Sequence, residues 1–162
     1  MSKVTDNIIL EDATIRFRNF AGKEGKFNPA GKRNFCLFLE PDLGAKLARD
    51  GWNVKQLAPR EPEDLPQDYI QVEVSYKNIP PKIYLINSGG KQLLNEDTID
   101  ILDWAEIENA DLVVRPYNWE VNGKKGVKAY VKTMYVTIFE DEFEKKYSHV
   151  AQDTQDEELP FL

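Results

Sequence analysis

The stretch VVRPYNWEVNGKKGVKAYV, residues 113–131, contains the strongest fold signal in the chain. Two alternating runs flank Asn122-Gly123, the residue pair most typical of the tight type I′ turn that joins two antiparallel strands. We therefore predict a long β hairpin with one strand from Ala110 to Val121 and the other from Lys124 to Phe139.

The turn also predicts which side chains share a face of the hairpin. A two-residue turn places Arg115 opposite Tyr130 and Tyr117 opposite Lys128, and a four-residue loop shifts the pairing but preserves the faces. In either register one face is cationic and aromatic, and it carries Arg115, Tyr117, Trp119, Lys128, Tyr130 and Lys132. The opposite face is apolar, with Val114, Pro116, Val127, Ala129 and Val131.

Other segments alternate with the period of two that marks half-buried strands. In the run from Ile8 to Phe20 we expect one side, Ala13, Ile15 and Phe17, to be buried and the other, Thr14, Arg16 and Arg18, to face solvent. The loop from Ala21 to Gly31 has three glycines and a proline, and the chain returns through the strand from Lys32 to Leu39. Further strands are predicted at Tyr69 to Lys77 and Lys82 to Ile86.

Two short helices complete the expected fold. The first runs from Leu43 to Arg49 and ends at Gly51, the usual glycine after a helix C-terminus. The second begins at the cap residue Asn95 and buries a stripe of Ile101, Leu102 and Trp104. Five or six strands with short helices and no βαβ alternation predict a mainly β fold, a small and mostly antiparallel barrel.

Composition predicts one domain, residues 1–145, followed by a tail, residues 146–162. The single cysteine, Cys36, lies in an apolar run and is expected to be a buried, inert thiol. Because His149 is the only histidine and Cys36 the only cysteine, no His/Cys metal ligand set and no nucleophile–histidine pair is available, so we expect no catalytic residue, metal or cofactor, although carboxylates could still bind magnesium. No run approaches the roughly 20 apolar residues that cross a bilayer, and we expect a cytoplasmic protein without membrane contact.

The net acidity of the chain lies mostly in its tail. Residues 139–162 contain eight acidic residues and two lysines, which gives −6 of the formal net charge of −7. An acidic terminal block is usually a solvated interaction segment, so we expect a disordered tail. Its last residues add an apolar tip that indicates partner binding: Asp156, Glu157, Glu158, Leu159, Pro160, Phe161 and Leu162.

The cationic and aromatic face of the hairpin indicates binding of a single-stranded nucleic acid. Bases stack on aromatic rings while Arg and Lys neutralise the phosphates. Further basic residues are expected to extend this surface, namely Arg16, Arg18, Lys32 and Arg33 with Lys23 and Lys26 near the first loop, and Lys124 and Lys125 at the hairpin tip. The alternative is that the aromatic residues simply pack beneath the second helix or the proline-rich connector 58–68.

These segments resemble a known family. The runs Ile15 to Phe20, Lys32 to Leu39 and Val113 to Val131 resemble phage single-stranded DNA-binding proteins with an OB fold. The tip is similar to the acidic Pro-Phe tip of bacterial single-stranded DNA-binding proteins, which recruits replication and repair enzymes. In that tip the phenylalanine is terminal, whereas Leu162 follows Phe161 here.

The resemblance implies an OB-fold, non-enzymatic protein that binds single-stranded DNA in phage replication, recombination or repair, in the host cytoplasm. It also implies that the tail recruits replication or recombination proteins and competes with DNA for the basic surface. The alternative is an adaptor or acidic inhibitor of a host DNA-processing protein. A carboxylate nuclease built on Glu96 to Glu108 is a more distant alternative. The sequence does not distinguish DNA from RNA as the ligand, or a monomer from a dimer.

Overall fold

The computed structural model describes residues 3–77 and 79–141, so the predicted tail, residues 146–162, and its apolar tip lie outside the described residues. Within them the chain forms a nine-stranded sheet with one α helix and one 3-10 helix. The strands are β1 (Ile8–Leu10), β2 (Thr14–Asn19), β3 (Arg33–Leu39), β4 (Lys55–Leu57), β5 (Gln67–Val74), β6 (Lys82–Asn87), β7 (Gly90–Leu94), β8 (Ile107–Val121) and β9 (Lys124–Ile138). The helices are α1 (Pro41–Asp50) and the 3-10 helix η1 (Ile99–Asp103).

The main path of the sheet runs β1-β8-β9-β5-β3-β2. Its two end strands, β1 and β2, are consecutive in the chain and separated only by residues 11–13. At this bend the Ala13 N–H donates to the Ala110 carbonyl at 2.8 Å, and the Asp12 N–H donates to an Asp111 carboxylate oxygen at 2.8 Å. One bent segment therefore joins β8 on one side to β3 on the other, and the sheet curls into a barrel.

The mainly β, OB-fold-like architecture predicted from the sequence is confirmed, with two differences in detail. The first run splits into β1 and β2, and β4 and β7 add short strands, which raises the number of strands to nine. Two pairings are parallel, β5 with β9 and β6 with β9. Parallel neighbours need a long connection, and the segment between β5 and β9 is long enough to contain β6, β7, η1 and β8.

The core lies between the inward faces of the strands. Phe20 and Phe35 are fully buried with their rings stacked 5.4 Å apart, and Met134 on β9 is also fully buried. Helix α1 covers one end of the sheet through the buried Leu47. It ends as predicted at Gly51, whose φ of 112° is a left-handed value that glycine adopts without strain.

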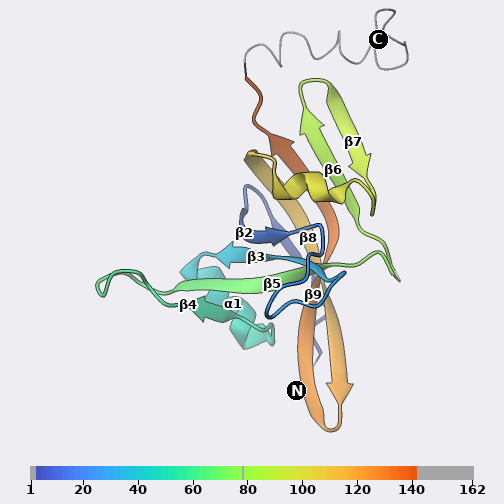
Figure 1. The fold of residues 1–162 in the computed structure, drawn as a ribbon. Coiled ribbons are helices and arrows are strands. Elements are labelled where there is room, and N and C mark those ends of the chain that lie inside the picture. Colours follow the sequence, from blue (N-terminus) through green and yellow to red (C-terminus); the bar gives the residue numbers. More distant parts are fainter. Residues whose placement is uncertain (1–2, 78, 142–162) are drawn as a thin grey trace, which may run out of the picture.

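Figure 1 shows that the β8–β9 hairpin is the longest element of the molecule. The β6–β7 hairpin lies near one end of it, and the turn at Asn122-Gly123 projects beyond β3, β4 and β5 at the other end. Both turn residues have positive φ, 53° for Asn122 and 81° for Gly123, as a type I′ turn requires. The predicted hairpin is therefore confirmed.

Two predictions of buried aromatic residues are wrong, each for a local geometric reason. Phe17 lies in a register shift between Arg16 and Asn19 with φ of 54°, and this bulge turns its side chain outward so that it is 67% exposed. The second helix forms as η1, which has three residues per turn, so Ile99 and Leu102 are its buried pair. Trp104 is consequently 75% exposed.

Cys36 is half-buried on the outer face of β3, which differs from the predicted core position. Strand alternation assigns the inward positions to Phe35, Leu37 and Leu39, which leaves Cys36 between Arg16 on β2 and Gln71 on β5. Burial raises the pKa of the Cys36 thiol, so the thiol stays protonated at neutral pH.

The structure predicts that replacing two phenylalanines, which the sequence alone does not distinguish, lowers the stability of the fold by different amounts. We expect Phe35→Ala to lower the free energy of unfolding by about 3–5 kcal/mol, because Phe35 is fully buried. Phe27→Ala is the matched control, since its ring is 91% exposed, and we expect a change within about 0.5 kcal/mol. Urea denaturation followed by circular dichroism measures both, and similar losses in the two variants would contradict the assigned core.

Candidate nucleic-acid interface

The register of the β8–β9 hairpin agrees with the two-residue turn. Arg115 pairs with Tyr130 and Tyr117 pairs with Lys128, as the sequence predicted. The register shifts between Val113 and Val114, and Lys132 is the residue of β9 left without an opposite residue there. Lys132 is exposed between the buried Val131 and the half-buried Thr133, so it still points away from the core.

The parallel pairing of β5 with β9 extends this face across four strands. Glu73 on β5 pairs with Tyr130, and it also pairs with Asn34 on β3. One cross-strand row therefore contains the buried Asn34 followed by Glu73, Tyr130 and Arg115. Glu73 belongs to this row although the sequence analysis did not include it, because a parallel contact between distant segments leaves no local pattern.

Tyr130 is at the centre of a cation–aromatic cluster. The Arg115 guanidinium lies 4.8 Å from the centre of the Tyr130 ring, and Tyr117 meets that ring edge-on with centroids 6.0 Å apart. Burial, together with the neighbouring Glu73 carboxylate, raises the pKa of Tyr130, so its hydroxyl stays protonated at neutral pH. Tyr117 is 51% exposed, which leaves much of its ring open to solvent.

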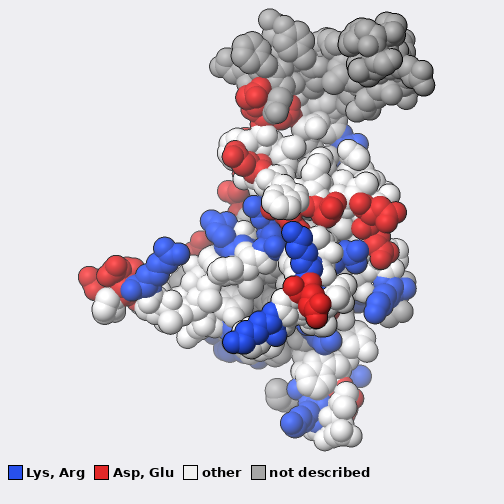
Figure 2. All heavy atoms as spheres, viewed as in Figure 1, with Lys and Arg blue, Asp and Glu red and all other residues white. Residues whose placement is uncertain are grey.

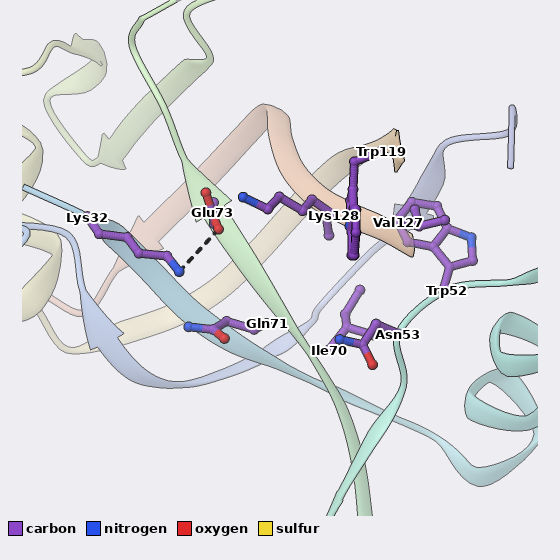
Figure 3. Close-up of a pocket in the computed structure, with 10 residues that line it drawn as sticks. Lys32, Trp52, Asn53, Ile70, Gln71, Glu73, Trp119, Val127 and Lys128 are labelled. Atoms are coloured by element: carbon purple, nitrogen blue, oxygen red, sulfur yellow. Dashed lines mark ion pairs between the residues drawn. The ribbon is translucent and has the colours of Figure 1, made fainter. Parts of the chain in front are cut away.

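Trp119 lies flat against its cross-strand partner, Gly126. A Cβ atom at position 126 would stand 2.5 Å from the Trp119 ring, so the glycine is needed for this close approach. The half-buried ring lines a hollow of about 210 Å³ together with Trp52 and Lys128 (Figure 3), and it lines a second hollow of about 240 Å³ with Val4 and Lys125. Trp119 therefore borders both hollows.

A larger hollow of about 720 Å³ continues from the first one over β3, β5 and β9. The two hollows share Lys32, Glu73 and Lys128 in their linings. The larger one also reaches Tyr130 on β9 and the end of the first loop at residues 29–31. Together they form a groove that runs from Trp119 to the first loop.

Cationic and anionic groups meet inside this groove. The Lys32 ammonium lies 3.4 Å from a Glu73 carboxylate oxygen, and Figure 3 shows the Lys128 side chain pointing toward Glu73 from the opposite side. Arg33 lies 3.8 Å from Glu96 and 5.8 Å from the centre of the Tyr76 ring. The Nε–H groups of Arg33 and Arg115 are buried and donate to no partner among the described residues.

The remaining predicted basic residues occupy three different environments. Arg16 is exposed on the outer face of β2, with its guanidinium 5.9 Å from the Phe38 ring. Arg18 instead turns toward η1 and donates to the carbonyls of Leu102 and Ala105, at 2.8 Å each, so it is not brought together with the hairpin face. Lys124 and Lys125 are exposed beside the projecting turn.

Figure 2 shows Lys and Arg side chains gathered over the middle of the visible face, where Figure 1 places β3, β5 and β9. Several Asp and Glu side chains lie nearer the margins of that face. The charge of the described body is thus unevenly distributed, and such a local field attracts polyanions even when the net charge is negative.

Comparison with protein families gives one decisive match. The model described as "Putative phage ssDNA-binding domain" matches residues 1–159. The chain belongs to this family. A comparison with curated proteins gives no match for this phage ssDNA-binding family member.

Solved structures with a similar fold come from bacteriophage Enc34. The single-stranded DNA-binding protein of Enc34 in complex with ssDNA matches with a TM-score of 0.55 and 12% identity, covering 85% of this chain and 89% of that chain. Its C-terminal truncation matches with a TM-score of 0.52 and 12% identity, covering 83% and 87%. At 12% identity these matches show that the chain shares the fold of the Enc34 proteins.

Two further findings concern residues 3–77 and 79–141. No helix in this part of the chain is long and apolar enough to cross a membrane. The same residues contain no group of three or more His, Cys, Asp or Glu side chains arranged to hold a metal ion, and the carboxylates near η1 do not form one.

The close contact between Trp119 and Gly126 predicts that adding a methyl group at position 126 displaces the indole. We expect Gly126→Ala to push the indole away from the hairpin, and quenching of tryptophan emission by acrylamide should increase. Gly25→Ala is the matched control, because a Cβ atom there meets nothing within 4 Å. Equal quenching in the two variants would show that Trp119 does not depend on this contact.

Proposed function

We propose that this chain is a non-enzymatic protein that binds single-stranded DNA without strong sequence preference and acts in phage DNA replication, recombination or repair in the host cytoplasm. The observation that carries the proposal is the groove in which the hairpin face, with Trp119, Lys128 and Tyr130, meets Lys32 across β5. Family membership agrees with this proposal.

The groove offers both contacts that an unpaired strand needs. Aromatic rings that remain partly exposed can stack on bases of any identity, at about 1–3 kcal/mol per base, so we assign stacking to Tyr117, Trp119 and Tyr130. Cations contribute by neutralising phosphates. We assign these contacts to Arg16, Lys32, Arg33, Arg115, Lys128 and Lys132, with Lys124 and Lys125 at the tip.

Glu73 competes with a phosphate for Lys32. While the groove is empty, its carboxylate holds the Lys32 ammonium at 3.4 Å. A phosphate that approaches Lys32 must replace this partner, so the net gain from the contact is smaller than from an unpaired lysine. Arg33 has a similar competitor, because its guanidinium lies 3.8 Å from a Glu96 carboxylate oxygen.

The tail, outside the described residues, completes the proposal. We assign its acidic residues to competition with DNA for the basic groove, since both are polyanions that would meet the same cations. We assign the tip, Asp156 to Leu162, to binding of replication or recombination proteins.

The proposal predicts a preference for single strands that weakens as salt is added. Four to six neutralised phosphates give a slope of about −3 to −4 in log K against log salt, at about −0.7 per contact. Fluorescence anisotropy with labelled oligo-dT and a duplex control measures the slope on the full chain. Absence of oligonucleotide binding at about 50 mM salt would favour the adaptor or inhibitor function, for which the acidic composition, with a pI near 4.9, is the motivating observation.

Trp119→Ala tests the stacking part of the site. We expect the affinity for oligo-dT to fall by about 1–3 kcal/mol, the contribution of one stacked base. Leu93→Ala is the control, because Leu93 is an exposed apolar residue on β7, outside the groove lining. Unchanged affinity in a folded Trp119→Ala variant would remove Trp119 from the site.

A further inference from the structure

Two exposed aromatic side chains beside the first loop have no role in the hairpin face. Phe27 is the more exposed of the two and Trp104 is three-quarters exposed, although large apolar side chains of this size normally gain free energy from burial. Each has a lysine ammonium near its ring, Lys26 at 5.4 Å from the centre of Phe27 and Lys23 at 5.1 Å from the centre of Trp104. Exposed aromatic rings paired with cations are a feature of surfaces that bind single-stranded nucleic acids.

Three asparagines hold the first loop in one conformation. Asn28 donates through Nδ2 to the carbonyls of Lys23 and Lys32, and its Oδ1 accepts from Asn34 at 2.7 Å. Asn19 accepts from the Lys23 N–H and donates to the Lys23 carbonyl. Because the backbone of Lys23 is held on both sides, only its side chain has to be ordered when a ligand arrives.

The segment that carries Trp104 is tied to the base of the same loop. The Asp103 carboxylate accepts the N–H groups of Phe20 and Ala21, at 2.7 and 3.0 Å. The two carbonyls to which Arg18 donates, those of Leu102 and Ala105, lie on either side of Trp104 in the chain. The backbone on both sides of Trp104 is therefore held beside the loop, and the Asp103 carboxylate is engaged in these hydrogen bonds.

The groove of the hairpin face leads to this loop. The hollow of about 720 Å³ is lined by Lys128 and Tyr130 of β9 and by residues 29–31 of the loop. A strand that leaves Tyr130 along the groove therefore arrives at the loop from which Lys23 reaches Trp104.

We propose that Trp104 and Lys23 form a second base-stacking site, at which the bound single strand continues beyond the groove. The open surface of the indole takes one unpaired base, and the Lys23 ammonium takes a neighbouring phosphate. This site rests on the proposed function, since it extends the same binding surface. Asp100 and Glu106 are exposed nearby in the sequence, so stacking rather than net charge supplies its contribution.

The test compares short and long oligo-dT in Trp104 variants of the full chain. Site sizes of OB folds run from about 4 to 16 nucleotides, so we use oligomers of these two lengths. We expect Trp104→Leu to weaken binding of the long oligomer by about 5- to 150-fold, the range for one stacked base, and to leave the short one unchanged. Trp104→Phe is the matched variant, because it keeps an aromatic ring and should retain most of the affinity.

The controls separate this site from the proposed function. Ile9→Ala, at another exposed apolar residue, should bind both oligomers like the wild type. If the wild type binds neither oligomer, the proposed function itself fails. If the wild type binds and Trp104→Leu binds the long oligomer equally well, the second site is overturned. Loss of a protein partner by this variant, with DNA binding intact, would also overturn it.

Discussion

The bend at residues 11–13 is the constraint on which the barrel depends. It lets β1 pair with β8 and β2 pair with β3, so one short segment joins the two ends of the sheet path. The hydrogen bond from the Ala13 N–H to the Ala110 carbonyl anchors the bend near the start of β8. Closure then brings β5 beside β9, and this contact places groups from distant parts of the chain on one outer surface.

The surface around the groove and the first loop contains several features that lower the stability of the fold. The Nε atoms of Arg33 and Arg115 are buried without a partner among the described residues, and Phe17 is in a left-handed conformation that costs free energy. Trp104 and Phe27 remain exposed. Departures of this kind are concentrated around the groove and the first loop, and such local costs are typical of binding sites.

The groove combines aromatic rings that are open for stacking with a lysine that is already paired with a carboxylate. In the proposed binding mode, aromatic rings provide stacking surfaces that accept any base, whereas Lys32 begins in an ion pair with Glu73 and exchanges it for a phosphate. Weak individual contacts distributed along a groove allow a strand to be held and released.

The sequence by itself determined the features that depend on local periodicity. The Asn122-Gly123 turn specified the hairpin register, and alternation then specified which side of it carries Arg115, Tyr130 and Lys128. The helix ending at Gly51 followed from local chemistry in the same way.

Only the tertiary structure decided which distant groups meet. The pairing of Glu73 with Tyr130 crosses between strands that are far apart in the chain, so no local pattern reports it. The turn of Arg18 toward η1 likewise depends on a contact across the fold. The exposure of Phe17 and Trp104 depends on a bulge and on a 3-10 helix, because one extra residue or a tighter turn reverses which face a side chain occupies.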